Sequence, residues 1–310
     1  MVRLISFGDK QFRRSLLSVK KTAGRFGVDE VCVYSKAQFS ATDFFKQNRH
    51  IAGLPRGAGY WLWKPYYILE NLLHMAEGDV LVYMDAGVSV VADLHPLISI
   101  AQQSAIVLFQ NCQGSDYIRQ TNLPFNYQNV YTEINSNKFW CKRDVFVALD
   151  ADTEAGWNSP NVDASFMVVR VCPAAISFVQ LWLHYCLVPG LITDAPNASS
   201  LDNFPGMINH LHDQSILSVL AFREGIELYR SPSQFGNHYK LPENRIAGEF
   251  IMLPYADEPK INSPYGTLLL HHRMRDIPFK LRLKHYVRNE LKIFDELYFG
   301  GILKSKLGGK

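Results

Sequence analysis

The sequence lacks the motifs that identify several large enzyme classes. Its 310 residues contain no GxGxxG, GxxxxGK[ST], HExxH or GxSxG pattern, which argues against nucleotide dehydrogenases, P-loop NTPases, zincins and α/β-hydrolases. The five cysteines are scattered and form no CxxC pair or zinc-finger spacing. We therefore expect reduced thiols and a cytoplasmic protein, because the first residues also lack the apolar run of a signal peptide.

Strong charge of one sign and long apolar runs are missing as well. The net charge of +3 is too small to indicate a nucleic-acid partner. Within the longest apolar stretch, residues 171–193, Pro173 and Pro189 confine any helix to about 174–188, which is too short to span a bilayer. We expect a buried core helix there, in a globular chain whose function comes from a site.

The positive charge is concentrated at the end of the sequence. Residues 273–310 carry a net charge of +6, and residues 1–272 carry −3. Leucines and aromatic residues alternate with the lysines, so we expect a basic amphipathic helical segment at 273–310 behind a folded domain at 1–272. This segment either contacts an anionic membrane, at the inner face of the cell membrane, or packs on the domain as a helix with a solvated basic face.

The order of apolar patterns predicts an α/β protein. A strand at 2–7, an amphipathic helix within 12–27 and a strand at 31–34 form a β-α-β opening, which favours a parallel sheet covered by helices. Further strands are predicted at 80–84, 105–110, 165–171, 226–229 and 267–270, and further helices at 65–76, 174–188 and 213–224.

An aspartate follows the most apolar of these strands. Residues 80–84 read VLVYM, as expected for a strand buried on both faces, and the run stops at Asp85-Ala86-Gly87. Ligands of open α/β sheets bind at the carboxyl ends of strands, so Asp85 is placed to coordinate a metal or to bind a ribose hydroxyl. The structural alternative is that Asp85 caps the following turn.

The segment 57–65, GAGYWLWKP, is dense in special residues. Its glycines allow a backbone to approach a ligand, Trp61 and Trp63 offer faces for a base or sugar, and Lys64 at a helix start can meet a phosphate. The structural alternative is an aromatic plug of the core.

Polar residues also mark the start of a late helix. Asp213 and Gln214 open the predicted helix at 213–224, directly after His212. Asp213 fits the N-cap position, but capping does not account for its polar neighbours. A further acid, Asp163, lies in the polar loop 157–165.

Two histidines follow the last predicted strand. His271 and His272 come directly after the apolar residues 268–270. Adjacent residues of a strand point to opposite faces, so one histidine at most is expected to reach Asp85 and form a metal pair with it.

In this order, the β-α-β start, VLVYMDAGV, HDQS and the late histidine pair resemble GT-A fold glycosyltransferases. The stretch DQSILS at 213–218 is similar to the Asp-Gln-Asp-X-Leu-Asn stretch of the glycogenin-like and lipopolysaccharide galactosyltransferase-like branch, and GYWLWKPYYIL with EGDVLVYMDAG resembles bacterial and large-virus polysaccharide glycosyltransferases. The resemblance covers most of 1–272. It implies a Rossmann-type mixed, mostly parallel sheet and sugar transfer from a nucleotide-sugar donor, with UDP as the default nucleotide, to a glycan or lipid-linked acceptor.

The resemblance also implies roles for single residues. In an inverting enzyme Asp213 is the first choice of base and Asp163 the second, whereas in a retaining enzyme Asp213 and Gln214 hold the donor sugar. The motif Asp85-Ala86-Gly87 has a glycine in place of the family's second acid. Either Mn²⁺ or Mg²⁺ is then held with the help of the donor diphosphate, or basic residues neutralise the phosphates. The expected metal ligands are Asp85, His271 and His272, and the expected donor-binding residues are Asp85, Gly87, Lys64, Trp61, Trp63, Arg273 and Arg275.

Two other functions remain open on the sequence alone. A sugar nucleotidyltransferase also uses a nucleotide-binding α/β sheet and metal carboxylates, and it releases pyrophosphate. A catalytically silent sugar-binding protein with the same fold is the second alternative, because Gly87 replaces an acid.

Overall fold

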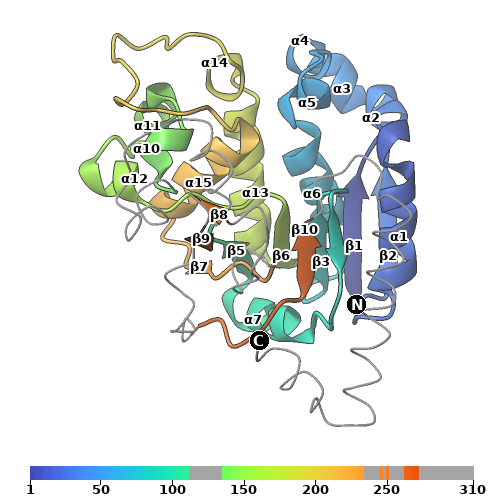
Figure 1. Cartoon of the computed structure of the whole chain (residues 1–310). Helices are drawn as coiled ribbons and strands as arrows, with labels where there is room; N and C mark the ends of the chain where they lie inside the picture. Colours follow the sequence, from blue (N-terminus) through green and yellow to red (C-terminus); the bar gives the residue numbers. More distant parts are fainter. Residues whose placement is uncertain (112–134, 234–244, 247–248, 251–261, 272–310) are drawn as a thin grey trace.

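The structure is a computed structural model, and it describes residues 1–111, 135–233, 245–246, 249–250 and 262–271 (Figure 1). The segment 273–310 and the residues His272, Arg273 and Arg275 lie outside the described residues. The proposed boundary between 272 and 273 therefore stays a prediction.

A mixed sheet forms the centre of the fold. Within the described residues its strand order is β2-β1-β3-β6-β5-β7, in which β6 runs antiparallel to both of its neighbours and the other strands are parallel to one another. The mostly parallel α/β sheet predicted from the sequence is thus confirmed. Its strands are β1 (Val2–Phe7), β2 (Glu30–Tyr34), β3 (Val80–Met84), β5 (Ile106–Phe109), β6 (Phe166–Arg170) and β7 (Leu228–Tyr229).

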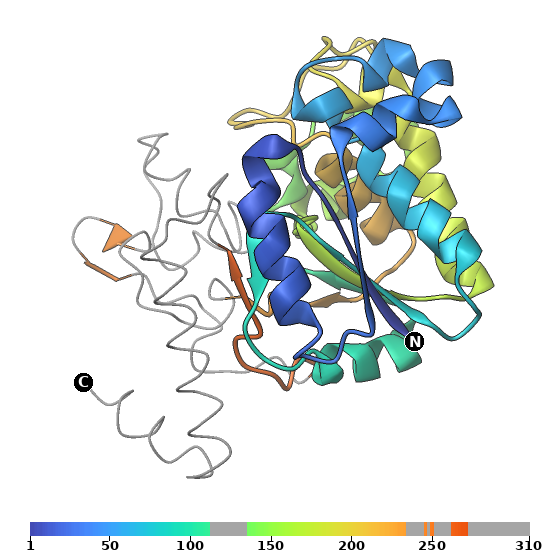
Figure 2. The same cartoon turned by 90° about the vertical axis from the view of Figure 1, so that its right-hand side faces the viewer.

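Alternation along the strands builds a core on each face of the sheet. In β3, Leu81 and Tyr83 face a core made with α6 (Trp63–His74), α13 (Pro173–Cys186) and α15 (Asp213–Arg223). Val80 and Val82 face the other core, which contains α1 (Arg13–Ala23) and α7 (His95–Ser104). Figure 2 shows helices on both faces of the sheet. Because β3 is covered on both sides, all five of its residues are buried, as the unbroken apolar run predicted.

Short helices and two small sheets complete the described part of the chain. In the second sheet, β4 pairs antiparallel with β10, and His271 at the end of β10 lies opposite Val88. The remaining elements are η1 (Lys10–Phe12), α2 (Lys36–Ala41), α3 (Asp43–Gln47), α4 (Arg49–Ala52), α5 (Gly57–Tyr60), β4 (Val88–Val90), α10 (Asn137–Trp140), α11 (Arg143–Ala148), α12 (Glu154–Asn158), α14 (Pro189–Ile192), β8 (Arg245–Ile246), β9 (Glu249–Phe250) and β10 (Leu269–His271).

The apolar stretch 171–193 forms a core helix, as predicted. Pro173 starts α13 and Pro189 starts the separate short helix α14. The indole of Trp182 is fully buried and donates to the backbone oxygen of Asp213, which fixes α13 against the start of α15. Among the described residues, no helix combines the length and the apolar character that crossing a membrane requires.

The topology places several loops at one end of the sheet. The carboxyl ends of β1 and β3 point toward α2–α5 and the loop around α14, at the top of Figure 1. This is the end at which open α/β sheets bind ligands.

Candidate active site

A cleft of about 720 Å³ lies at this end of the sheet. It is lined by segments from both halves of the described chain, which approach each other only in the folded protein. Among the predicted site residues that the structure describes, all line this cleft: Trp61, Trp63, Lys64, Asp85, Gly87, Asp163, Asp213, Gln214 and His271.

A buried lysine surrounded by acids forms the floor of the cleft. Lys64 Nζ lies 3.0 Å from Asp213 Oδ2 and 3.8 Å from Asp85 Oδ1, and it donates to the Ala164 backbone oxygen at 3.1 Å. The side chain of Lys64 is only 4% exposed, so its charge depends on these partners. We call Lys64, Asp85, Asp163 and Asp213 the carboxylate cluster.

The cluster shifts the pKa values of Lys64 and Asp213. Burial alone would lower the pKa of Lys64, but the charges of Asp213, Asp85 and Asp163 together raise it. Burial raises the pKa of Asp213 to about 6, although Lys64 acts in the opposite direction. Asp213 is therefore an ionised carboxylate at pH 7 that takes up a proton only slightly below it. Such a group is suited to accept a proton during catalysis.

Asp85 does not cap the turn that follows β3. Its carboxylate accepts a hydrogen bond from the Tyr83 hydroxyl and faces Lys64. The backbone N–H of Asp85 donates to the Ser165 oxygen at 2.8 Å, which joins the end of β3 to the loop before β6. The carboxylate thus points into the cleft, beside Gly87.

Asp163 lies beside the predicted histidine. Asp163 Oδ2 is 3.6 Å from His271 Nε2, and its Oδ1 accepts from the backbone and the hydroxyl of Ser165. His271 reaches this position because β10 pairs with β4, next to the Asp85-Ala86-Gly87 turn. The sequence predicted that one histidine would pair with Asp85, whereas the acid that His271 contacts here is Asp163, and a metal pair with Asp85 stays a prediction.

The start of α15 corrects one interpretation. His212, and not Asp213, is the N-cap residue, and Asp213 is the first residue of the helix. His212 has φ 58° and ψ −117°, an uncommon conformation for a residue with a side chain. This backbone directs the Asp213 carboxylate to Lys64, while Gln214 Nε2 donates to Asn161 Oδ1 at 2.8 Å.

The two tryptophans of the 57–65 segment have different surroundings. Trp63 is 5% exposed and stacks on Phe7 at 3.9 Å between ring centroids, so it is mainly a core residue. Trp61 is partly exposed and stacks on His212 at 5.5 Å. Gly59 serves internal packing, because its φ is 99° and a Cβ there would lie 2.6 Å from Ala52. The aromatic-plug interpretation therefore describes Trp63, and Trp61 remains the candidate for stacking on a ligand.

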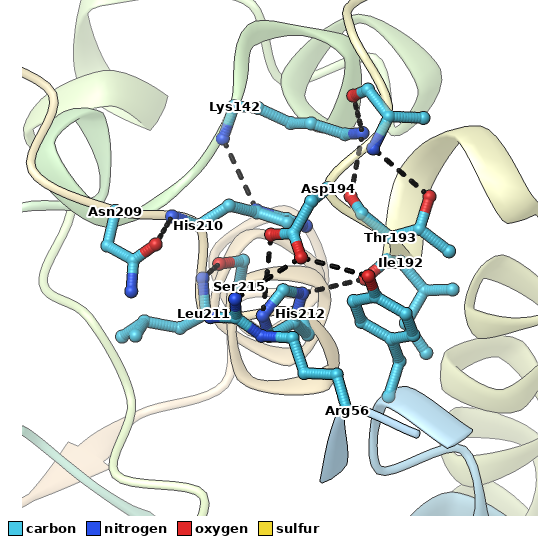
Figure 3. A network of polar contacts seen from close by, with 12 residues as sticks. Arg56, Lys142, Ile192, Thr193, Asp194, Asn209, His210, Leu211, His212 and Ser215 are labelled. Atoms are coloured by element: carbon cyan, nitrogen blue, oxygen red, sulfur yellow. Dashed lines mark hydrogen bonds and ion pairs between the residues drawn. The ribbon is translucent and has the colours of Figure 1, made fainter. Parts of the chain in front are cut away.

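A second group of polar residues, three of which line the cleft, is joined by hydrogen bonds and ion pairs (Figure 3). Asp194 Oδ2 lies 3.3 Å from Arg56 Nη1 and accepts from the Tyr60 hydroxyl at 2.9 Å. His212 Nδ1 is 2.8 Å from the Ile192 oxygen, which makes it the protonated nitrogen, and its Nε2 lies 3.8 Å from Asp194 Oδ1. We call Arg56, Tyr60, Asp194, His210 and His212 the histidine network.

The imidazoles of this network are buried, and the carboxylate beside His212 is the largely exposed Asp194, whose Oδ1 lies 3.8 Å from His212 Nε2. Burial lowers the pKa of His212, and it lowers the pKa of His210 to about 3. His210 is held by the Leu191 oxygen, which lies 2.8 Å from its Nε2. Both imidazoles are neutral at pH 7, in contrast to the charged carboxylate cluster beside them.

Several cleft residues were not predicted from the sequence. At the end of β1, the residues Gly8, Asp9 and Phe12 line the cleft, and Lys36 joins them from the start of α2. Asp85 was predicted as a site residue because ligands bind at the carboxyl ends of strands. The same reasoning applies to Gly8 and Asp9, which follow the predicted strand 2–7. Arg56 and the His210 side chain carry no such signal, because only tertiary contacts place them here.

The described residues do not make a complete metal site. Among them, no group of three or more His, Cys, Asp or Glu side chains is placed to hold a cation. Asp85 faces Lys64 and the Tyr83 hydroxyl, and the expected ligand His272 lies outside the described residues. No catalytic step below is therefore assigned to a metal.

Comparisons with known proteins return glycosyltransferases as similar solved structures. The chain is similar to the bifunctional glycosyltransferase WbbM in its apo form (10% identity, 93% of this chain and 49% of that chain, TM-score 0.49) and to apo mouse xyloside xylosyltransferase 1 (10%, 90% and 100%, 0.43). It is also similar to the galactosyltransferase LgtC in complex with donor and acceptor sugar analogs (13%, 87% and 87%, 0.40). The chain spans about half the length of WbbM. No family model and no curated protein matches.

Proposed function

We propose that this chain is a glycosyltransferase that moves a sugar from a nucleotide-sugar donor to a glycan or lipid-linked acceptor. The observation that supports this most directly is the buried contact of Lys64 with Asp213 and Asp85 at the carboxyl ends of the strands. A cleft of about 720 Å³ falls within the range of roughly 300–1,000 Å³ typical of small-ligand sites. The sequence resemblance supports the same reaction.

The cleft offers separate positions for the parts of a donor. Phe12 and Lys36 lie at the β1 end, where an aromatic ring and a cation can meet a base and a phosphate. Asp85 is available to a ribose hydroxyl, and Lys36 and Arg56 supply positive charge for the diphosphate that leaves. The uridine nucleotides are the first donors to test, because the resemblance favours them.

Asp213 is the group we assign to the reacting centre. In an inverting reaction the carboxylate takes the proton of the acceptor hydroxyl as that oxygen bonds to the anomeric carbon and the bond to the nucleoside diphosphate breaks. In a retaining reaction Asp213 and Gln214 hold the donor sugar. Both the inverting and the retaining reaction need an ionised Asp213. NMR identification of the product anomer shows which of the two reactions takes place.

The test is a thermal-shift panel followed by product analysis. The panel contains UDP, GDP, CDP, TDP, CMP and their common sugar conjugates, each with Mn²⁺, Mg²⁺ or EDTA, because a ligand of the native state raises the melting temperature. We expect a selective shift with one nucleotide and release of the nucleoside diphosphate during turnover. The EDTA samples show whether donor binding needs a metal such as Mn²⁺ or Mg²⁺.

Other outcomes identify the alternatives. Release of pyrophosphate from a nucleoside triphosphate would identify a sugar nucleotidyltransferase, and sugar-nucleotide binding without turnover would identify a silent sugar-binding protein. The variant Asp213→Asn is the control that links activity to the site. It should keep the nucleotide-induced shift and reduce transfer by about 10²–10⁴-fold, the usual contribution of a catalytic base.

A further inference from the structure

A second cavity of about 460 Å³ lies beside the cleft. The loop between α14 and α15 forms most of its wall, and Lys142 from the start of α11 forms the rest. Asn209 and His210 line both the cavity and the cleft, so the two spaces meet at a shared wall. His210 is close in sequence to Asp213, the residue that we assign to the reacting centre.

The wall of the second cavity combines polar and apolar groups. Its polar side comprises the carboxylate of Asp194 and the amides of Asn197, Asn203 and Asn209. Asn197 Oδ1 is buried and has no hydrogen-bond partner among the described residues. Apolar surface comes from Pro196, Phe204, Met207 and Ile208. Sugars present the same combination, because hydroxyl groups alternate with C–H faces.

The loop that forms this wall is fixed before any ligand binds. Asp144 accepts from the backbone N–H groups of Ala198 and Ser199, which anchors the middle of the loop to α11. The Lys142 ammonium donates to the Thr193 and Ala195 oxygens at 3.2 and 3.1 Å. A preformed wall loses little conformational entropy on binding.

We propose that the second cavity is the subsite for the acceptor, and that it binds a neutral carbohydrate unit next to the sugar that receives the transferred residue. The assignment rests on the proposed function. Since the Lys142 ammonium is already bonded to two carbonyl oxygens and Asp194 is an acid, the wall favours neutral hydroxyl groups over phosphate or carboxylate. Asn209 and His210 line both spaces and precede Asp213 by only a few residues, so the cavity lies next to the reacting centre, as an acceptor subsite must.

Binding of simple sugars tests the subsite directly. Saturation-transfer difference NMR is recorded with the methyl glycosides of glucose, galactose, mannose, xylose and N-acetylglucosamine and the full chain. We expect saturation transfer to at least one glycoside, and no displacement of that glycoside by the nucleotide that binds the cleft. Absence of transfer to every glycoside, or displacement by the nucleotide, would overturn the proposal.

Variants that fill the cavity test the location of the subsite, and a third variant on the same loop is their matched control. Met207→Trp and Pro196→Trp introduce a large ring from two sides of the cavity, whereas Leu201→Trp places the same ring on the same loop at a site that is 42% exposed and lines neither space. The two cavity variants should lose glycoside binding and raise the acceptor KM by about tenfold or more, as expected when a pocket no longer fits its ligand. Leu201→Trp should match the wild type.

The nucleotide response separates failure of this proposal from failure of the proposed function. A cavity variant counts only if it still shows the wild-type thermal shift with the nucleotide, which shows that it is folded. If nucleotides bind and turnover occurs but both cavity variants keep wild-type glycoside binding, the subsite assignment is wrong and the transferase proposal stands. If glycosides bind here and no nucleotide binds, the cavity is a carbohydrate site and the transferase proposal is wrong.

Discussion

Two groups of polar side chains lie in and beside the cleft, and their buried members are compensated in different ways. The carboxylate cluster keeps its charges, because Lys64 lies within 4 Å of two carboxylates. The histidine network contains two imidazoles with lowered pKa values, held by the backbone oxygens of Leu191 and Ile192. A buried charge needs an opposite charge, whereas a neutral imidazole needs only a hydrogen-bond acceptor.

This difference separates two roles along one cleft. Charges that are held in place before the substrate arrives can stabilise a reaction in which charge moves, so the carboxylate cluster is suited to catalysis. Neutral imidazoles contribute hydrogen bonds and shape, and His212 joins the loop after α14 to Trp61 by ring stacking. The comparison predicts that disturbing the first group changes stability and transfer strongly, and that disturbing the second changes them less.

The largest effect is expected for Lys64→Met, which keeps the length of the side chain and removes its charge. Two carboxylates would then lack their buried counter-charge, which costs about 3–5 kcal/mol in unfolding free energy. Transfer should also be lost, since Asp213 would bind its proton more tightly. Chemical denaturation and activity assays measure both effects.

The double variant Lys64→Met/Asp213→Asn sharpens this prediction. It removes the charge of Asp213 together with that of Lys64, so it should recover part of the lost stability, and the coupling between the two sites is read from the double-mutant cycle. Additive losses would show that the two side chains do not depend on each other. Transfer should stay absent in the double variant, because stability and catalysis have separate causes here.

The second effect is smaller than that of Lys64→Met. It is a pair of opposite pH dependences of the unfolding free energy, one caused by Asp213 and the other by His210. Asp213 has a pKa of about 6 against an ordinary 3.8, so the folded state binds the proton more tightly, and this term lowers stability as pH rises from about 4 through 6. His210 has a pKa of about 3 against 6.5, so the unfolded state binds the proton more tightly, and this term lowers stability as pH falls below 6.5. Between pH 4 and 6 the two terms oppose each other.

Single variants separate the two terms. Across this range Asp213→Asn should lose stability more steeply on acidification than the wild type, and His210→Gln should lose it less steeply. Each slope should differ from that of the wild type by at most about 1.4 kcal/mol per pH unit, the limit for one proton. Denaturant titrations at a series of pH values measure the slopes, and parallel curves for all three proteins would contradict the assignment.

The sequence predicts the carboxylate cluster better than the histidine network, for a physical reason. The segments 2–7 and 80–84 are the strands β1 and β3 with the predicted bounds, and β3 is continuously apolar because it is covered on both faces. A polar residue directly after such a strand lies at the edge of the sheet where ligands bind. This reasoning predicted Asp85 as a site residue. Asp213 was found at the predicted start of the late helix, and its role was implied by the resemblance to GT-A glycosyltransferases.

The sequence does not show which residues of distant segments will contact each other in the folded protein. Lys64 was predicted as a phosphate ligand, and its contact with Asp213 depends on the packing of α6 and α15 around the same strand ends. Trp61 and Trp63 look equivalent in the sequence, yet only Trp63 stacks on Phe7 in the core. Arg56 and Asp194 carry no local signal at all, since their pairing arises only when the two loops meet across the cleft.

The smallest effect is expected for Asp194→Asn, in the histidine network. Its side chain is 44% exposed, and the Arg56 side chain paired with it is 47% exposed, so water and salt screen the interaction. The asparagine oxygen can still accept from the Tyr60 hydroxyl, and only the charge is removed. The unfolding free energy should fall by about 1 kcal/mol or less, as for other exposed ion pairs, and the difference from the wild type should vanish at about 1 M salt. A loss as large as that of Lys64→Met, or one that persists in high salt, would show that this network holds a buried charge, and the contrast between the two groups would fail.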